Sequence, residues 1–465
     1  MMDQDQPTAI VCADHENGFS PHPRPQSASS ATGARRLAGA VLLGWLLFQS
    51  LSLPAQEPAS PAPAATAAFD TEAATRTYLQ RMTTVQKARS DAYFEGGYWL
   101  QLWQFLYGCA VAALFLETGL SARLRNLALR LTRFKPLQTA FYAIQYTLVA
   151  AVLSFPLTVY SDFFREHKYG LATQSFGLWF GDWTKSLLVG LILGSLFMMV
   201  LFGVVRRLQR TWHIWGALVA LGFMILAMVI APVFIAPLFN KYTPLADRKV
   251  VEPILRLARG NGVAADKVYE MDASKQTTRV SANVSGFLGT MRITLNDNLL
   301  KRCSLPEIEA VMAHEIGHYV LNHVFKSLLF FGVVIVVGFI LLRWSVTRLL
   351  AFFGPRWGVT GITDLAVVPL VVFLLSAYFF VLTPFTNSFV RMQEMEADIF
   401  GLNAARQPDG FAEAALKLGE YRKMQPGPFE EWFFFDHPSG ATRIRTAMQW
   451  KGANLAASPA SASAK

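Results

Sequence analysis

Two histidines and a glutamate within the sequence HEIGH have the clearest capacity for chemistry. His314 and His318 are four residues apart, so on a helix both imidazoles leave the same face about one turn apart. That spacing lets two ring nitrogens bind one Zn²⁺ ion at roughly 2.0–2.1 Å each. Glu315 follows the first histidine and can take a proton from a water molecule beside the metal. The pattern predicts the HExxH arrangement of a zinc metalloprotease.

The motif is short, so a chance match must be weighed against it. The chain has 465 residues and only eight histidines, and a chance HExxH in a protein of this length is roughly a one-in-a-hundred event. The competing interpretation is an ordinary buried helix with incidental histidines. The pentapeptide favours the metal site.

A catalytic zinc site needs a third protein ligand. The spacing HExxHxxGxxH is absent, because Leu321 and Val324 occupy the positions of its glycine and last histidine. His323 lies five residues past His318, roughly 500° around a helix. We therefore expect His323 to be structural or to support a ligand rather than to bind the metal.

A carboxylate from a later helix is the better candidate for the third ligand. Glu394 and Asp398 are four residues apart and share one helical face. Glu394 can complete a His₂Glu site, and Asp398 can accept a ring N–H from a liganding histidine. Taken alone, the pair would more often be a solvated charged face. Because an HExxH motif precedes the pair in this chain, we favour a metal ligand and its supporting carboxylate over a solvated charged face.

The helix that must carry HExxH has a clear start. Ser304 fits its N-cap, Pro306 is tolerated in the first turn, and Glu307 completes a capping box. The helix expected from this signal places the two histidines well inside a regular stretch.

The rest of the chain is apolar. Hydrophobic residues make up 53%, charged residues 16%, and the mean hydropathy is +0.31. Soluble domains are nearer a quarter charged, so these values exclude a single soluble domain and indicate a membrane protein. Seven apolar runs approach the roughly 20 helical residues that span a bilayer. They cover about 37–53, 98–116, 139–160, 186–205, 214–238, 328–342 and 365–385.

The first run, 37–53, has two interpretations. Arg35 and Arg36 precede it and Pro-Ala-rich sequence follows it, which is typical of a secretory signal peptide. However, Leu53 rather than a small residue stands two positions before Ala55, the best cleavage candidate. We favour a retained helix.

The charges of the short loops predict an orientation. Basic residues gather in the loops after the second, fourth and sixth runs: Arg123, Arg125, Arg130, Arg133 and Lys135; Arg206, Arg207 and Arg210; Arg343, Arg348 and Arg356. The positive-inside rule places these loops in the cytoplasm and the HExxH segment on the opposite side. We expect a multi-pass protein of a bacterial inner membrane with its catalytic side in the periplasm.

Two further classes of function are disfavoured. The net charge of +10 could suggest nucleic-acid binding, but membrane topology accounts for the basic loops, and we expect no nucleic-acid partner. Cys12, Cys109 and Cys303 are too few and too scattered for a disulfide framework or a four-thiolate metal site.

Several ordered motifs together are similar to one family. They are DASK at 272–275, SAN at 281–283, RITLND at 292–297, HEIGHYVLNH at 314–323, ExxxD at 394–398, and DHPS at 436–439 followed by Arg443. In these motifs and in its seven-run layout, most of the chain resembles the integral-membrane zinc endopeptidases of the CAAX prenyl protease type, an HExxH…ExxxD gluzincin family.

The resemblance implies roles for individual residues. The single Zn²⁺ would be held by His314, His318 and Glu394, with Glu315 as general base and later proton donor and Asp398 supporting a ligand. His437 would hydrogen-bond the oxyanion, and Arg443 would brace the carboxylates. Ala282 and Asn283 would lie on an edge strand that pairs with the substrate backbone. Without the resemblance, His437 would be interpreted as part of a turn.

The expected fold is mainly α: a polytopic membrane protein with about seven transmembrane helices and a gluzincin-like zinc protease domain that contains a small β-sheet. We divide the chain into a disordered N-terminus (1–36), transmembrane helices 1–5 (37–238), a soluble insert with the substrate strand and the HExxH helix (239–323), transmembrane helices 6–7 (324–386), a C-terminal catalytic domain (387–452) and a disordered tail (453–465).

We predict a zinc endopeptidase that acts on peptide or protein substrates beside the lipid bilayer. Whether its substrates are prenylated stays open, because the loop charges place the site outward whereas the eukaryotic enzymes of this type work on the cytosolic side. The alternatives are a quality-control protease for membrane and envelope proteins, and a zinc-binding inactive scaffold. A transporter is disfavoured because ionisable residues are nearly absent from the runs.

Overall fold

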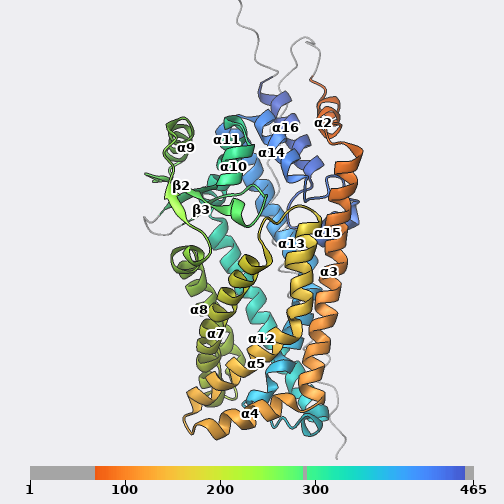
Figure 1. The fold of residues 1–465 in the computed structure, drawn as a ribbon, viewed down its shortest axis with the longest axis vertical. Coiled ribbons are helices and arrows are strands. Elements are labelled where there is room, and N and C mark those ends of the chain that lie inside the picture. The colour runs from red at the N-terminus through yellow and green to blue at the C-terminus, as the bar shows by residue number, and fades with distance from the viewer. Residues whose placement is uncertain (1–68, 286–290, 456–465) are drawn as a thin grey trace, which may run out of the picture. The chain divides into compact units, whose positions relative to one another are not determined.

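The structure is a computed structural model, which describes residues 69–285 and 291–455. The predicted disordered N-terminus (1–36) and the first apolar run (37–53) lie outside these residues. The described part is mostly helical, with one small sheet (Figure 1). This confirms the predicted fold class.

Six helices are long and apolar enough to cross a membrane, counted over the residues that the structure describes. They are α3 (Thr84–Glu117), α5 (Lys135–Val159), α7 (Phe176–Arg207), α8 (Trp212–Ile230), α12 (His323–Trp357) and α13 (Val368–Ala405). Each, together with the short helical turns that extend three of them, contains one of the second to seventh apolar runs. Short helical turns extend three of them: η1 (Tyr160–Phe164) and α6 (Arg165–Lys168) after α5, η2 (Ala231–Ile235) and η3 (Ala236–Leu238) after α8, and η5 (Leu365–Val367) before α13.

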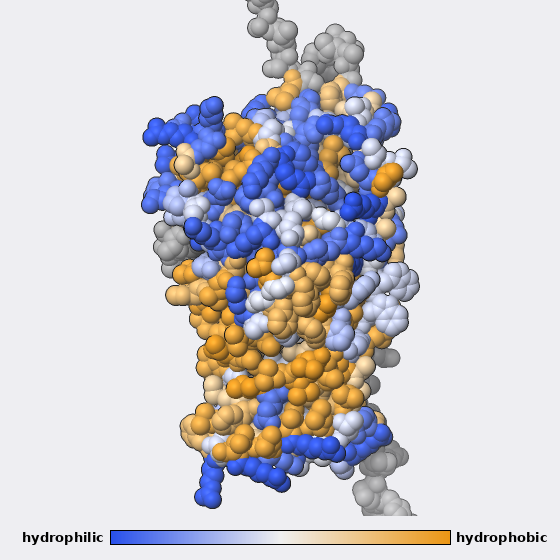
Figure 2. All heavy atoms as spheres, in the orientation of Figure 1, coloured by the Kyte–Doolittle hydropathy of each residue, from blue (hydrophilic) through white to orange (hydrophobic). Residues whose placement is uncertain are grey.

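The outer surface of this bundle is apolar. On the face that Figure 2 shows, a hydrophobic band covers the spanning helices, with hydrophilic residues above it and a hydrophilic rim below, and these helices carry many exposed large apolar side chains. A belt bounded by polar surface at both ends is what a bilayer requires of a protein that crosses it. The chain is therefore a multi-pass membrane protein.

The three basic loops lie together at one end of the bundle. The amphipathic helix α4 (Leu120–Leu131), which we did not predict, is part of this end (Figure 1). Arg125 donates to the carbonyl of Gly358 at 2.9 Å and pairs with Asp364. Arg343 donates to the carbonyl of Arg210 at 2.9 Å. The loops that the charge pattern assigned to one side of the membrane are thus in contact.

A small mixed sheet lies at the opposite end (Figure 1). Its strands are β1 (Tyr242–Pro244), β2 (Val268–Met271), β3 (Ala282–Ser285) and β4 (Arg292–Asn296), in the order β1-β2-β4-β3. β2 and β4 are parallel, and the two edge strands run antiparallel to them. β3 is therefore an edge strand, as we expected of the segment at 281–283.

The remaining helices lie at the same end of the bundle as this sheet (Figure 1). They are α2 (Thr71–Leu79), α9 (Arg248–Gly260), η4 (Ala273–Lys275), α10 (Asp297–Arg302), α11 (Leu305–Val320), α14 (Pro408–Leu418), α15 (Pro428–Phe434) and α16 (Gly440–Asn454). Ile254 of α9, Ile293 and Leu295 of β4, and Met312 and Ile316 of α11 form one buried core. α2 was not predicted. α16 extends two residues into the segment predicted to be a disordered tail.

Two glycines let α11 contact its neighbours closely. A Cβ on Gly401 of α13 would lie 3.0 Å from the backbone nitrogen of His314, and one on Gly410 of α14 would lie 2.5 Å from the carbonyl oxygen of Pro306. Only a residue without a side chain allows these approaches. As a result, α13 crosses directly over the HExxH histidines.

Candidate metal centre and active site

The HExxH helix begins where its capping signal predicts. The backbone N–H of Ser304 donates to Glu307 Oε2 at 2.6 Å, and the Ser304 hydroxyl donates to the same oxygen at 2.7 Å. Lys417 of α14 pairs with the other oxygen of Glu307 at 2.6 Å. The first turn of α11 is thereby tied to α14, which fixes the helix relative to the rest of the site.

Three candidate ligands converge on one point. His314 Nε2 and His318 Nε2 are 3.1 Å apart. Glu394 of α13 lies 3.2 Å from His314 through Oε2 and 3.4 Å from His318 through Oε1. The ligand atoms of these residues all lie within 4.8 Å of one another. The structure therefore brings together the two histidines of one helix and the glutamate of another.

These residues fit a zinc ion. Ligands at 2.0–2.1 Å from a tetrahedral zinc lie about 3.3–3.4 Å from each other, close to the separations seen here. Glu394 Oε2 is buried and makes no hydrogen bond within the described residues, although two imidazole nitrogens lie 3.2 Å away. A buried carboxylate oxygen without a hydrogen-bond donor suits a cation.

The electrostatics of the two histidines agree with this fit. Burial, together with the charge of His314, lowers the pKa of His318 to about 4, so His318 is neutral, as a metal ligand must be. Burial by itself lowers the pKa of His314, but the two carboxylates that face its ring nitrogens, Asp398 and Glu394, raise it to about 9. A proton or a cation is therefore strongly favoured where His314 faces these carboxylates.

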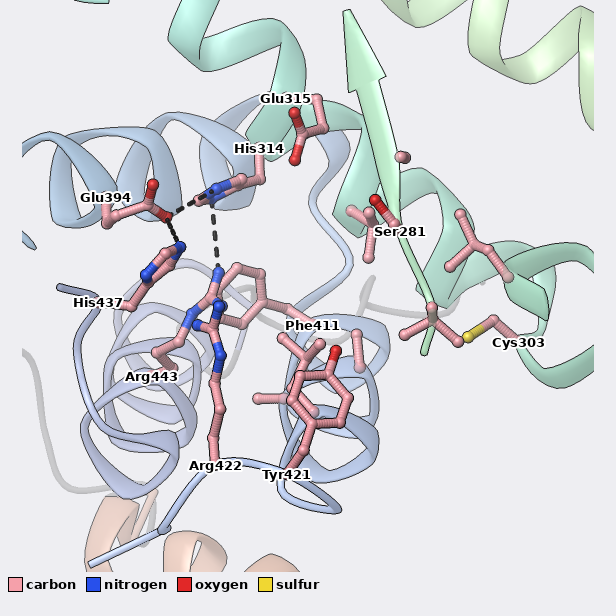
Figure 3. Close-up of a pocket in the computed structure, with 17 residues that line it drawn as sticks. Ser281, Cys303, His314, Glu315, Glu394, Phe411, Tyr421, Arg422, His437 and Arg443 are labelled. Atoms are coloured by element: carbon pink, nitrogen blue, oxygen red, sulfur yellow. Dashed lines mark hydrogen bonds and ion pairs between the residues drawn. The ribbon is translucent and has the colours of Figure 1, made fainter. Parts of the chain in front are cut away.

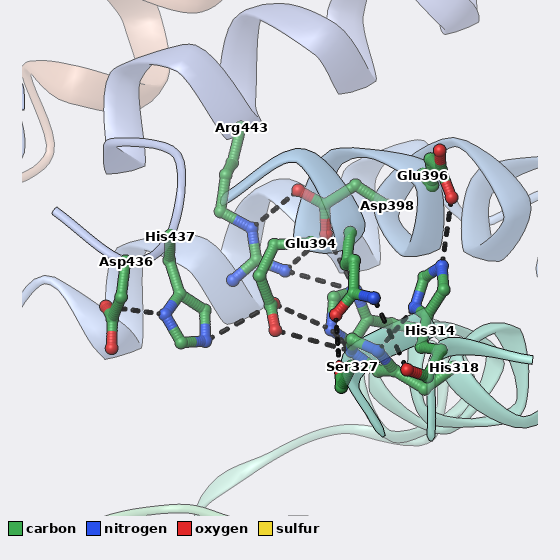
Figure 4. Close-up of polar contacts among 11 residues, drawn as sticks. His314, His318, Ser327, Glu394, Glu396, Asp398, Asp436, His437 and Arg443 are labelled. Atoms are coloured by element: carbon green, nitrogen blue, oxygen red, sulfur yellow. Dashed lines mark hydrogen bonds and ion pairs between the residues drawn. The ribbon is translucent and has the colours of Figure 1, made fainter. Parts of the chain in front are cut away.

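Asp398 lies behind His314. Its Oδ1 is 2.8 Å from His314 Nδ1, which leaves Nε2 facing Glu394. Arg443 of α16 donates through Nε to Asp398 Oδ2 at 2.9 Å and contacts Oδ1 through Nη2. All three side chains are buried (Figure 4). Asp398 is therefore held by one cation while it orients a candidate ligand.

His318 has a longer chain of partners. Its Nδ1 lies 2.8 Å from His323 Nδ1, and His323 Nε2 lies 3.0 Å from Glu396 Oε2. Lys326 pairs with the same carboxylate. If the Nε2–H of His323 donates a hydrogen bond to Glu396, then His323 Nδ1 carries no proton and accepts a hydrogen bond from the Nδ1–H of His318. The other nitrogen of His318, Nε2, is then unprotonated, and its lone pair faces the metal site. The assignment follows from the requirement that each hydrogen bond has one donor.

Sequence reasoning missed Glu396. It lies two residues past Glu394, on a different face of α13, and contacts α12 rather than α11. Only the pairing of α12 with α13 brings it to His323, so no helical-face argument could have found it.

Glu315 and His437 enter one cavity of about 250 Å³ together with His314 and Glu394 (Figure 3). His437 Nε2 lies 3.2 Å from Glu394 Oε2, and its Nδ1 lies 2.8 Å from Asp436 Oδ1. Burial raises the pKa of Glu315 to about 7, and the charge of Glu394 adds to this effect. A carboxylate that exchanges protons near neutral pH is suited to general acid–base chemistry.

Of the two candidate substrate-binding residues on β3, Ala282 and Asn283, only the first faces the cavity. Ala282 lines the cavity. Asn283 is exposed, and it pairs in register with Thr294 of β4. The edge strand therefore presents Ala282 to the site.

Comparisons with known proteins show which family the chain is similar to. Residues 73–241 match a family described as CAAX prenyl protease N-terminal, five membrane helices, and residues 244–451 match peptidase family M48. The chain is 31% identical to a CAAX prenyl protease 1 homolog of Oryza sativa subsp. japonica, over 63% of this chain and 69% of the rice protein.

A bacterial protein and a solved structure are also similar. The chain is 29% identical to an uncharacterized metalloprotease of Bacillus subtilis, YhfN, over 71% of this chain and 78% of that protein. The crystal structure of Ste24p from S. mikatae has a TM-score of 0.69, with 24% identity, over 81% of this chain and 94% of that one. The likeness in structure shows that the two proteins share a fold.

Proposed function

The chain belongs to peptidase family M48, among the membrane metalloproteases of the CAAX prenyl protease type, and on this basis we propose that it is a zinc endopeptidase with Glu315 as its general base. The observation that carries this proposal is the convergence of His314, His318 and Glu394, with donor atoms 3.1–3.4 Å apart. Glu315 enters the same cavity.

His314, His318 and Glu394 would hold the ion. When bound, zinc supplies Lewis-acid catalysis, since it lowers the pKa of a water molecule and polarises a carbonyl group. Asp398 and Arg443 hold the ring of His314 in the orientation that presents Nε2. His323 and Glu396 do the same for His318.

The remaining steps belong to side chains of the cavity. Glu315 takes one proton as the water oxygen attacks the scissile carbonyl carbon. It then passes this proton to the peptide nitrogen, and the carbon–nitrogen bond breaks. His437 donates from Nε2 to the carbonyl oxygen as negative charge develops there, while Asp436 holds its other nitrogen. β3 binds the substrate backbone along its open edge, with Ala282 beside the scissile bond.

We further propose that the site faces the outer side of a bacterial inner membrane. The three basic loops lie at the end of the bundle opposite the sheet, and the positive-inside rule assigns that end to the cytoplasm. An outward site favours a second candidate function, proteolysis of membrane and envelope proteins without a prenyl requirement. Reporter fusions to the loop at 206–211 and to the C-terminus would test the orientation, and the same activity of both fusions would contradict it.

Cleavage by purified protein in detergent tests the function directly. A farnesylated CAAX-type peptide is compared with its unprenylated twin, and Glu315→Gln serves as the blank. We expect zinc in both proteins and cleavage only by the unmodified one. Preference for the prenylated peptide would establish CAAX proteolysis, and equal cleavage would favour the general protease. If neither peptide is cut while zinc is bound, the inactive scaffold replaces the proposal.

A further inference from the structure

α15 carries apolar side chains on an exposed face. Phe429, Trp432 and Phe433 stand at positions i, i+3 and i+4, so they share one face of this helix. Their ring centroids lie 5.8–6.0 Å from one another. Phe429 is 70% exposed and Trp432 is 43% exposed. Three adjoining aromatic rings thus form a surface patch, which we call the aromatic face of α15.

The acidic side chains of the same helix are paired within the protein. Glu430 accepts a hydrogen bond from the Tyr98 hydroxyl of α3 at 2.7 Å and pairs with Lys423 at 2.8 Å. The Glu431 carboxylate accepts from the backbone N–H of Ser439 at 2.9 Å. In water the opposite arrangement is favourable, with charges outside and rings inside. An exposed apolar patch of this kind marks contact with an apolar partner.

α15 lies at the level where two spanning helices leave the bilayer. Tyr98 is the first residue of the second apolar run, and its ring stacks on that of Phe434 with a centroid distance of 3.8 Å. Asn387 follows the end of the seventh apolar run and donates to the Phe433 carbonyl at 2.8 Å. Figure 1 shows α15 beside α3 and α13. The two contacts therefore place α15 at the membrane boundary, on the side of the proposed zinc site.

Other aromatic side chains at this level are exposed too. Trp99, next to Tyr98 on α3, is 65% exposed, and Trp103, about one turn further along, is 60% exposed. Tryptophan gathers where lipid headgroups meet acyl chains, because its ring is apolar and its N–H is polar. The aromatic face of α15 thus lies level with the edge of the hydrophobic band. Its chemistry and its level both favour the lipid surface as its partner.

α15 also holds the segment that carries His437. Arg391 of α13 donates to the Glu431 carbonyl at 2.9 Å and contacts the carbonyl of Phe435. Phe435 is buried, and the hydrogen bond from Ser439 to the Glu431 carboxylate closes the short segment between α15 and α16. His437 stands within this segment. Because the segment is tied to α15 at both ends, a displacement of α15 displaces His437.

We propose that α15 lies on the bilayer, with its aromatic face at the boundary of headgroups and acyl chains, and that this contact positions His437 in the catalytic cavity. The inference rests on the proposed function, in which His437 donates to the oxyanion. Phe429 and Trp432 are then positioning residues, and the lipid surface supports a catalytic group. An apolar group of the substrate would fit the same rings, and the experiment separates the two partners.

The first test locates α15 and does not depend on catalysis. The photoreactive residue p-benzoylphenylalanine replaces Phe429 in full-length protein, reconstituted in vesicles of phosphatidylethanolamine and phosphatidylglycerol, and mass spectrometry identifies what it binds covalently on illumination. Val85 is the matched control, because it is 78% exposed on α3 and lies about 20 Å further from the apolar run along the same helix. We expect lipid adducts from position 429 and none from position 85.

The second test asks whether α15 acts through His437. In the same vesicles, Phe429→Gln combined with Trp432→Gln should lower the kcat of peptide cleavage about 10- to 100-fold, the cost of a misplaced catalytic group, with little change in KM or bound zinc. In a His437→Ala background the same two changes should have no further effect, because effects that pass through one residue are not additive. Trp432→Phe keeps an apolar ring and should keep the wild-type kcat, as should Val85→Gln.

Each contrary outcome has a distinct meaning. Absence of lipid adducts from position 429 would contradict the docking of α15, and adducts to an added farnesylated peptide in place of lipid would assign the aromatic face to the substrate. If the two changes lower kcat equally with and without His437, or release zinc, the contact does not act through His437 and that part of the inference is wrong. If the wild type cuts no peptide, the proposed function fails, whereas the adducts still decide whether α15 lies on the bilayer.

Discussion

Replacing His323 tests whether the chain from His318 to Glu396 supports the metal site. His323→Ala removes the partner 2.8 Å from His318 Nδ1 and leaves that nitrogen without its hydrogen bond. Groups that orient a liganding histidine are typically worth 10- to 100-fold in metal affinity. We therefore expect zinc affinity to fall about 10- to 100-fold, equivalent to about 1.4–2.8 kcal/mol.

Zinc affinity is measured by competition with a chelator of known affinity, so the result does not depend on catalysis. Two variants of Glu396 should lower zinc affinity by smaller amounts. Glu396→Ala should lower it less than His323→Ala does, and Glu396→Gln should lower it least, because an amide oxygen still accepts a hydrogen bond from His323 Nε2. Lys326→Met is the control, since Lys326 contacts Glu396 but not His323. Unchanged affinity in a folded His323→Ala protein would refute the reasoning.

Three further predictions concern the same site. The kcat/KM should fall as the pH drops through the pKa of Glu315, because a general base works only when deprotonated. Burial raises this pKa to about 7, and a bound cation lowers it. A loss of kcat/KM that already begins above pH 7 as the pH is lowered would contradict the assignment. Arg443→Met should destabilise the protein by about 3–5 kcal/mol, because it leaves Asp398 buried without its cation; an unchanged denaturation midpoint would argue against this pairing. Gly401→Ala should lower bound zinc measured by elemental analysis, since its Cβ would lie 3.0 Å from the His314 backbone; full zinc occupancy would show that α13 can shift.

The features that the sequence predicts correctly are local ones. The i, i+4 spacing places His314 with His318, and Glu394 with Asp398, on single helical faces. Run length identifies the spanning helices, and the capping box at Ser304 marks the start of α11. Each depends only on residues within a few turns of one another.

The features that it misses depend on packing or lack a strong pattern. α2 and α4 are short and amphipathic, so no run of apolar residues marks them. Glu396 is joined to His323 only where α12 meets α13. α15 has only seven residues, and its position depends on Tyr98 of α3, more than 300 residues away.

α13 carries its apolar run and Glu394 in one unbroken helix. The run ends near Phe385, nine residues before Glu394, which corresponds to about 14 Å of helix at 1.5 Å per residue. The length of this helix segment therefore fixes the distance between the candidate metal site and the hydrocarbon layer. An extended peptide covers about 3.3–3.6 Å per residue, so a substrate anchored in the same leaflet would be cut about four residues beyond its anchor.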